Sequence, residues 1–250
     1  MKPAPNFSII TITYNNHDGL SRTGKSITLQ SYFDYEWIII DGASADNTKA
    51  YLKTLNADNI IIISEPDNGI YDAMNKGIDQ ATGQYLIFMN AGDVFADANI
   101  LETIAEQESN DDFIYGDALE NNEGGNLFYK SARPYTKIDY GMITHHQAMI
   151  YNRDLISELR YNIAYKIAAD YDFTRCFLKQ SEHVRYIPEP ICIFEHGGIS
   201  QTQTRLARQE QFDIRNNEIS ILKNRMVYAL QFITISLKAY MPWLYRILRK

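Results

Sequence analysis

The chain has 250 residues, of which 45% are hydrophobic and 22% are charged, and its formal net charge at pH 7 is −7. This composition is typical of a globular protein with a sizeable core, and the acidic balance argues against a nucleic-acid-binding surface over the whole protein. The two cysteines, Cys176 and Cys192, have no metal-ligand spacing, which excludes a disulfide framework and favours a reducing cytoplasm.

The first 90 residues alternate between two patterns. Apolar runs rich in β-branched residues predict strands, and the segments between them have helical spacing or helix-capping residues. The expected strands cover 7–14, 36–41, 59–65 and 83–90, and the expected helices cover 19–32, 44–56 and 70–82, the first with Leu20, Ile27 and Leu29 on its apolar face. Because the strands do not alternate apolar with polar residues, we expect a mostly parallel sheet covered on both faces.

The second half mixes shorter elements. "DDFIYGDALE" and "NLFYKSA" flank the turn sequence "NNEGG" and predict a β-hairpin, and from about residue 202 the pattern is helical. The nearest thing to a boundary lies at 200–204. No apolar run reaches about 18 residues, so no membrane-spanning helix is expected, and the apolar run at the N-terminus is too short for a signal peptide.

Polar residues gather at the predicted strand ends, where parallel sheets bind their ligands. Asp93 in "YLIFMNAGDVF" follows an almost wholly apolar run. A buried carboxylate without a partner is costly, so we expect Asp93 in a cleft with a partner. The alternative is a turn-capping role, for which Asn-Ala-Gly-Asp is suitable.

Six motifs occur in an order that resembles the family 2 glycosyltransferases with the GT-A fold, most closely the bacterial exopolysaccharide group of the colanic acid type. They are "SIITITYNN", "IIIDGASADNT", "SEPDNGIYDAMNKGI", "YLIFMNAGDVF", "AADYDFTRCF" and "GGIS". The resemblance implies one α/β domain over 1–201, with a nucleotide-sugar-binding half at 1–95 and an acceptor half at 96–201, followed by a helical tail at 202–250. It also implies inverting sugar transfer in a single displacement.

The resemblance implies a divalent metal, Mn²⁺ or Mg²⁺, at Asp93. The family usually has Asp-x-Asp at this strand end, and here "NAGD" leaves Asp93 as its one carboxylate. Such hard cations take oxygen ligands and often share them with substrate phosphates. His196, just before "GGIS", is a second candidate metal ligand.

By the same resemblance, one set of residues binds the donor nucleotide: Thr13, Tyr14, Asn15, Asp41, Asp67, Lys76 and Asn90. Asp41 would accept a hydrogen bond from the base, although it could equally be a turn aspartate ahead of a helix capped by Ser44 or Asp46. Tyr14 could stack on the base or pack in the core.

Lys76 would lie near the donor phosphates. Asp72, in the same motif, is a weaker candidate, since negative charge is favoured in the first turn of any helix. A simple ion pair between Asp72 and Lys76, four residues apart on a helix, is the competing interpretation.

Asp170 is the expected general base for the acceptor hydroxyl. The family often has Glu-Asp here, and Ala169 replaces the first acid. The competing role is a helix N-cap, in which case the base would be Asp172, Asp117 or His146. For the acceptor site we also consider His146, otherwise a structural histidine, and Arg133, which could meet an acceptor phosphate or simply lie on the surface.

The sequence therefore predicts a glycosyltransferase that uses a nucleotide-sugar, expected to be a UDP-sugar, and a saccharide or lipid-linked acceptor in cell-surface polysaccharide synthesis. We expect it in the cytoplasm, at the inner face of the membrane. The basic, aromatic-rich segment 223–250 suits a membrane interface, or it packs on protein. A non-catalytic binding scaffold is the main alternative. A pyrophosphorylase or dinucleotide oxidoreductase would need a glycine-rich loop after the first strand, and "TYNNHDG" has one glycine.

Overall fold

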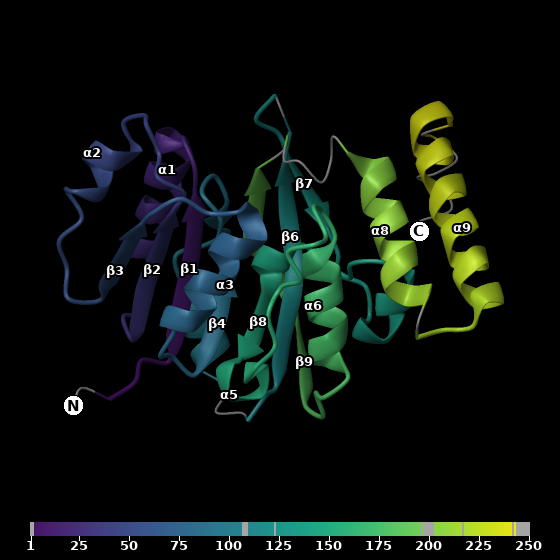
Figure 1. The fold of residues 1–250 in the computed structure, drawn as a ribbon. Coiled ribbons are helices and arrows are strands. Elements are labelled where there is room, and N and C mark those ends of the chain that lie inside the picture. The colour runs from purple at the N-terminus through teal and green to yellow at the C-terminus, as the bar shows by residue number, and fades with distance from the viewer. Residues whose placement is uncertain are drawn as a thin grey trace.

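One sheet runs through the centre of the molecule in this computed structural model (Figure 1), which describes residues 3–106, 110–122, 124–195, 197, 203–216, 218–241 and 243. Within those residues its strands are β1 (Phe7–Thr13), β2 (Tyr35–Asp41), β3 (Ile60–Ser64), β4 (Tyr85–Phe88), β5 (Val94–Phe95), β6 (Phe113–Asn121), β7 (Leu127–Lys130), β8 (Met149–Asn152) and β9 (Val184–Glu195). Their order is β3-β2-β1-β4-β8-β6-β9-β5, and β7 pairs with β6.

The strand directions confirm a mostly parallel sheet. β3, β2, β1 and β4 are parallel neighbours, β6 and β9 run the same way, and β5, β7 and β8 run opposite. The predicted hairpin is also present, as the antiparallel pair β6 and β7, with Asn121 opposite Leu127. The first half is the parallel unit that the sequence pattern indicates, whereas the second half is mixed.

Helices cover both faces of the sheet, as the apolar strand runs require. The helices are α1 (His17–Thr28), α2 (Thr48–Leu52), α3 (Ile70–Gln80), α4 (Ile100–Ala105), α5 (Arg153–Ile156), α6 (Ala169–Leu178), α8 (Thr204–Asn216) and α9 (Ile221–Tyr240), with 3₁₀ turns η1 (Tyr135–Tyr140) and η2 (His146–Ala148). Adjacent residues of β1 point to opposite faces: Ile9 packs in the cluster under α1, and Ile10 in the cluster under α3 and α6.

Two details of the helices differ from the sequence prediction. Leu20 and Ile27 of α1 are fully buried, but Leu29 lies past the helix end and is 60% exposed. α2 is shorter than the predicted 44–56 because Ser44 does not cap a helix: its N–H and hydroxyl both donate to Asp41, in the turn that follows β2.

The antiparallel insertion of β8 between β4 and β6 decides where the site lies. β4 runs toward the carboxyl edge of the parallel strands, and β8 starts from that edge. Ile87 pairs with Ile150, the second residue of β8, and η2 comes directly before β8. The "NAGD" turn and η2 therefore meet at the edge where ligands of such sheets bind.

The C-terminal helices pack beside the second half (Figure 1). Glu210 of α8 accepts hydrogen bonds from the backbone N–H groups of Lys166, Ile167 and Ala168, at 2.8 to 2.9 Å, so α8 is fixed to the loop that leads into α6. None of the helices in the described ranges is both long and apolar enough to cross a membrane. The proposed division of the chain at residue 201 stays a prediction.

Candidate active site

The loops after β1 and β2 interlock. The N–H of Asn15, which has a positive φ of 47°, donates to Ser44 Oγ at 2.8 Å, and Asn15 Oδ1 accepts from the N–H of Ala45 at 2.8 Å. The Thr13 hydroxyl is buried without a hydrogen-bond partner. Tyr14 is 66% exposed beside these groups, so the core-packing interpretation of Tyr14 is wrong. An unpaired buried hydroxyl next to an exposed ring suits a bound ligand.

Asp41 is fully buried at the end of β2. Its carboxylate accepts from the Ser44 N–H at 3.2 Å and from the Ser64 hydroxyl at 2.6 Å, and it also accepts from the Ser44 hydroxyl. Asp41 thus ties β2, β3 and the intervening turn together. At the start of α2 it is Asp46 that accepts a hydrogen bond from the backbone, from the N–H of Thr48 at 2.9 Å.

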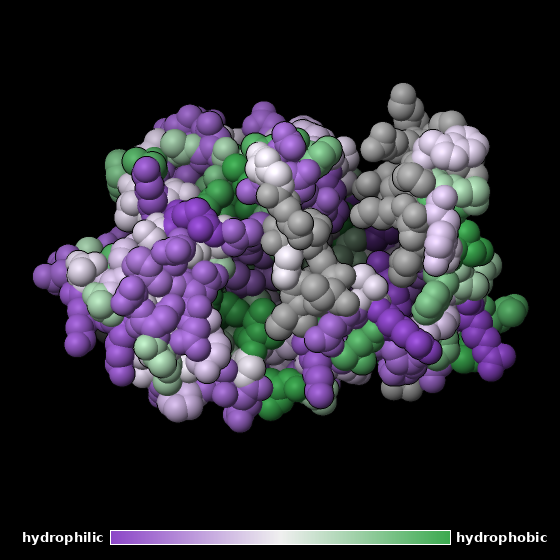
Figure 2. Space-filling view, turned by 90° about the horizontal axis from the view of Figure 1, so that it is seen from above, coloured by the Kyte–Doolittle hydropathy of each residue, from purple (hydrophilic) through white to green (hydrophobic). Residues whose placement is uncertain are grey.

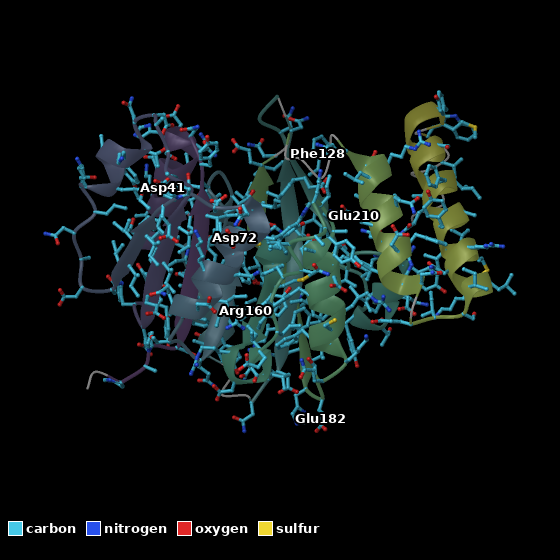
Figure 3. All side chains as sticks on the ribbon, viewed as in Figure 1. Asp41, Asp72, Phe128, Arg160, Glu182 and Glu210 are labelled. Atoms are coloured by element: carbon cyan, nitrogen blue, oxygen red, sulfur yellow. The ribbon has the colours of Figure 1, made fainter. Side chains whose placement is uncertain are left out.

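The "EPDNGIYDAMNKG" segment places its charges around the end of β3. Lys76 pairs with Glu65 at 2.8 Å and not with Asp72, so the competing interpretation, a helix ion pair between Asp72 and Lys76, is wrong. Asp72 instead accepts from the N–H of Asn68 at 2.9 Å, just before the helix, in the first turn where negative charge is favoured. In Figure 3, Asp41 and Asp72 lie toward the carboxyl ends of the parallel strands, and Glu182 lies at the opposite end.

Asp67 belongs to the turn just before α3. Its Oδ1 accepts from the N–H of Gly69 at 2.8 Å, and its Oδ2 lies 2.6 Å from where a Cβ at Gly42 would be. Asp67 therefore stands over the turn that follows Asp41, in the same set of loops.

Asp93 is 5% exposed, and two residues donate hydrogen bonds to its carboxylate. Oδ1 accepts from the N–H of Glu195 at 2.9 Å, and Oδ2 accepts from the Gln147 side chain. Burial raises the pKa of Asp93 to about 7. Within the described part of the chain no lysine or arginine pairs with this carboxylate, so a bound cation would relieve its desolvation.

The turn that carries Asp93 is built around a glycine and a threonine. Gly92 has φ 114°, a backbone angle that favours glycine, and a Cβ there would also displace the Glu195 side chain, whose Oε2 would lie 2.2 Å away. The Thr23 hydroxyl donates to the Asp93 carbonyl at 2.7 Å and accepts from the Gly92 N–H at 3.0 Å. Thr23, which holds this turn through both bonds, is 70 residues from Asp93 in the sequence.

The only carboxylate beside Asp93 in the described residues is that of Glu195. No group of three His, Cys, Asp or Glu side chains gathers anywhere in those residues. His196 lies outside them. The residues present therefore fit a cation held by one or two carboxylates and by ligand oxygens, the arrangement expected for Mg²⁺ or Mn²⁺ with a diphosphate.

Asp170 lies at the second position of α6, and Ala168 occupies the N-cap, so the N-cap interpretation is wrong. Its side chain is 21% exposed, and its Oδ1 accepts from the N–H of Tyr171 at 2.8 Å. Burial raises the pKa of Asp170 to about 6. A partly exposed carboxyl group with such a pKa is suited to take a proton near neutral pH.

His146 bridges Asp170 to the end of β4. Its Nδ1 is 3.7 Å from Asp170 Oδ2, and its Nε2 is 3.0 Å from Asn90 Nδ2. Burial lowers the pKa of His146 to about 3, so the ring is neutral. The structure thus brings together three residues that the sequence placed in three separate roles.

Arg133 is engaged with the backbone. It donates to the carbonyls of Gly141, at 2.7 Å, and Met142, at 2.5 Å, and is half-buried, so simple surface exposure does not describe it. Asp117 is buried and accepts from the hydroxyls of Tyr129 and Tyr186, which removes it from the candidate bases. The roles assigned to the individual site residues stay predictions.

Sequence reasoning missed Gln147 and Thr23. Gln147 stands beside His146 in "HHQAMIY", and only the antiparallel pairing of β8, which follows it, with β4 brings it to Asp93. Thr23 looks like an ordinary helix residue. No spacing signal could have found either, because each contact spans more than 50 residues.

Comparison with known proteins identifies the family of this chain. The family model "Glycosyl transferase family 2" matches residues 8–190. A PGL/p-HBAD biosynthesis glycosyltransferase of Mycobacterium bovis (BCG Pasteur) is 34% identical over 209 residues, which is 80% of each chain. A GalNAc(5)-diNAcBac-PP-undecaprenol β-1,3-glucosyltransferase of Campylobacter jejuni is 29% identical over 126 residues, 48% of this chain and 40% of the relative.

Solved structures resemble the whole fold. TarS 1–349 of S. aureus, in complex with UDP-GlcNAc, has a TM-score of 0.71 and 17% identity, over 93% of this chain and 73% of that one. The mannosyltransferase PcManGT of Pyrobaculum calidifontis, in complex with GDP-Man and Mn²⁺, has a TM-score of 0.63 and 17% identity, over 98% and 73%. The GT-A fold is confirmed, and the narrower resemblance to colanic acid transferases stays a prediction.

Proposed function

The chain belongs to glycosyl transferase family 2, and from that premise we propose that it moves a sugar, with inversion, from a UDP-sugar to a saccharide or lipid-linked acceptor in cell-surface polysaccharide synthesis. The observation that supports this most is the pair of carboxylates at one sheet edge. Asp93 is buried without a cationic partner in the described residues, and Asp170 is partly exposed with a pKa of about 6. Asp93 suits the binding of a cation with a diphosphate, and Asp170 suits proton transfer from an acceptor hydroxyl.

In the proposed reaction Asp170 takes the proton of the acceptor hydroxyl. The hydroxyl oxygen forms a bond to the anomeric carbon while the bond from that carbon to the diphosphate oxygen breaks, and the nucleoside diphosphate leaves with the electron pair. Attack from the face opposite the leaving group inverts the anomeric configuration, so an α-linked donor gives a β-linked product. General-base assistance of this kind contributes about 10² to 10⁴-fold.

We propose that Asp93, with Glu195 beside it, holds a divalent cation. When bound, the cation stabilises the negative charge of the departing diphosphate. His196 remains a proposed further ligand. The PcManGT complex with GDP-Man and Mn²⁺ supports the binding of a divalent cation beside the donor in a protein of the same fold.

The donor would lie over the interlocked loops after β1 to β3. The free Thr13 hydroxyl and exposed Tyr14 are proposed to contact the base and ribose, with Asn15 and Asp67 framing the pocket. Asp41 accepts its hydrogen bonds from Ser44 and Ser64, so it supports this pocket first and reaches the base only if one of these serines turns away. Lys76 would lie at the phosphate side. The TarS complexes with UDP and UDP-GlcNAc support a uridine donor.

The acceptor is proposed to approach from the side of His146 and Arg133, and the tail to meet the membrane that carries it. α9 packs inward with Asn224, Val227 and Gln231, all buried. Its outer face exposes four apolar residues at helical spacing: Leu222 (78%), Met226 (52%), Leu230 (46%) and Ile233 (54%). Figure 2 shows hydrophobic groups at the surface on the side of the C-terminal helices. No acidic residue follows Glu218, so this face suits an anionic lipid surface at the cytoplasmic side.

The membrane contact can be tested without knowing the substrate. Leu222→Ser together with Met226→Ser should weaken sedimentation with vesicles containing anionic lipid, while the melting temperature stays close to wild type because both side chains are exposed. Tyr14→Ser, an exposed apolar residue far from α9, serves as the control. Unchanged vesicle binding in the double variant would favour a protein partner for this face.

A screen of purified protein against nucleotide-sugars, with and without Mn²⁺, tests the function itself. We expect metal-dependent release of nucleoside diphosphate from one class of donor, faster when a saccharide acceptor is present. Binding of a nucleotide-sugar with no turnover under any condition would instead support a non-catalytic scaffold.

A further inference from the structure

The short turn η2 contacts both of the carboxylates on which the proposed reaction depends. Its first residue, His146, lies against Asp170, and its second, Gln147, donates to Asp93. We propose that η2 is a positioning device in which His146 orients the base and Gln147 orients the carboxylate of the cation site. This inference rests on the proposed function and assigns neither residue contact with the reacting atoms.

The hydrogen bond to Asn90 decides which nitrogen of His146 carries the proton. A neutral imidazole donates from one nitrogen and accepts at the other. Asn90 Nδ2 can only donate, and in the orientation of this amide it lies 3.0 Å from Nε2, so we assign Nε2 as the acceptor and Nδ1 as the nitrogen that carries the proton. Nδ1 is the nitrogen that faces Asp170, at 3.7 Å from Oδ2.

The Nδ1–H group of His146 is placed to orient the carboxylate of Asp170. The separation exceeds a hydrogen bond in the free protein, and contacts of this kind commonly shorten when substrate binds. Oδ1 already accepts from the N–H of Tyr171, so a bond from His146 to Oδ2 would fix the plane of the carboxylate. Each oxygen would keep one lone pair for the acceptor hydroxyl. The bond also stabilises the charged form against the burial and the nearby Glu210 that raise its pKa.

Gln147, the next residue of η2, orients the carboxylate of Asp93. It is 1% exposed, and its Nε2 donates to Asp93 Oδ2, while the Glu195 N–H holds Oδ1. Gln147 Oε1 has no partner, so the amide is placed by this one bond. Because His146 and Gln147 share one backbone turn, a shift of η2 moves the supports of both carboxylates together.

Matched substitutions at His146 separate positioning from packing. Asn keeps an N–H near the place of Nδ1, facing Asp170, and Gln keeps one near the place of Nε2, facing Asn90. His146→Asn should keep kcat within about tenfold of wild type, whereas His146→Gln should lose about 10²-fold, the lower end for impaired general-base catalysis. In His146→Gln the acid limb of the kcat profile should move to higher pH, and both variants should bind UDP with Mn²⁺ as wild type does.

Gln147→Leu should give the opposite result. Loss of the bond to Asp93 should weaken the binding of UDP with Mn²⁺ by about 10 to 100-fold in calorimetry, the cost of removing the partner of a metal ligand, with no shift of the acid limb. Thr144→Val is the control for damage to packing. Thr144 is buried in the same loop, and its hydroxyl has no partner, so valine should leave both measurements unchanged.

Two results would overturn the inference. Equal kcat for His146→Asn and His146→Gln would reduce His146 to a packing residue, and wild-type affinity in Gln147→Leu would do the same for Gln147. ¹⁵N NMR of the wild-type histidines should show His146 neutral and protonated on Nδ1, and an Nε2-protonated ring would contradict the assignment. The NMR measurement needs no substrate, so it decides the point even if no nucleotide-sugar is turned over and the proposed function fails.

Discussion

The loops after β1 to β3 and the seam between β4, η2 and α6 both gather carboxylates at the carboxyl ends of strands, and they treat them in opposite ways. Asp41, in the loops, is fully buried and accepts bonds from two serines. Asp93 and Asp170, at the seam, have fewer donors than their burial demands, and their pKa values are raised to about 7 and about 6. In the loops after β1 to β3, hydrogen bonds offset the cost of burying the carboxylate. At the seam between β4, η2 and α6, part of that cost is not offset.

This difference indicates that the carboxylate in the loops after β1 to β3 is structural, whereas the two carboxylates at the seam are available for binding and reaction. A carboxylate with satisfied oxygens stabilises the loops that it joins, and it has little left for a ligand. A carboxylate that is short of partners gains free energy from a cation or a proton, and such groups are candidates for function. The following predictions test this contrast, in order of decreasing effect.

Asp170→Asn should lower kcat by about 10² to 10⁴-fold, because the amide keeps the size of the side chain but cannot take a proton. Binding of UDP with Mn²⁺ should be unchanged in calorimetry. Asp172→Asn, two residues further along α6, is the control and should lose much less. If Asp170→Asn stays within about tenfold of wild type, short of the range for a base, the search moves to Asp172 or His146.

Asp93→Ala should lower kcat by about 10² to 10³-fold, the range for losing one group that stabilises transition-state charge, and should weaken UDP binding when Mn²⁺ is present. Asp97→Ala, an exposed turn residue close by, should do neither. A wild-type rate that is insensitive to EDTA would remove the metal and leave Asp93 as a turn residue.

The rate should depend on pH through Asp170. The base must be ionised, so kcat should fall about tenfold per pH unit below about 6. A raised carboxyl pKa also means that the folded protein binds this proton more tightly than the unfolded chain, so this group's contribution to stability falls as pH rises from about 4 to about 6. Asp170→Asn should therefore unfold at a higher temperature than wild type at pH 8, and a lower melting temperature would contradict the shift.

Asp41→Ala should have the smallest catalytic effect and a clear structural one. It removes the acceptor for Ser44 and Ser64, which should lower the free energy of unfolding by about 1 to 3 kcal/mol in urea denaturation. The donor KM should rise by more than kcat falls, since binding is lost equally in the ground and transition states. Unchanged stability with unchanged UDP affinity would show that Asp41 belongs to neither framework nor site.

The sequence by itself determined the regular half of the molecule. Apolar runs predicted β1 to β4 to within a few residues. β1, β2 and β4 are buried along their whole length, and such strands are nearly continuous apolar runs, whereas the isoleucine run of β3 lies at the sheet edge. The same runs located Asp41 and Asp93, since a charge that follows a buried strand must lie at its end. The family motifs added the GT-A fold, which comparison with solved structures confirmed.

Partners across the fold were decided only by the tertiary structure. Lys76 forms an ion pair with Glu65 and not with Asp72. Ser44 donates a hydrogen bond to Asp41 and does not cap a helix. The contact of Gln147 with Asp93 depends on β8 entering the sheet antiparallel to β4, which no local pattern records. Burial and spacing are properties of a segment and can be read from its residues, whereas the pKa of a carboxyl group depends on every donor and charge that the folded chain brings to it.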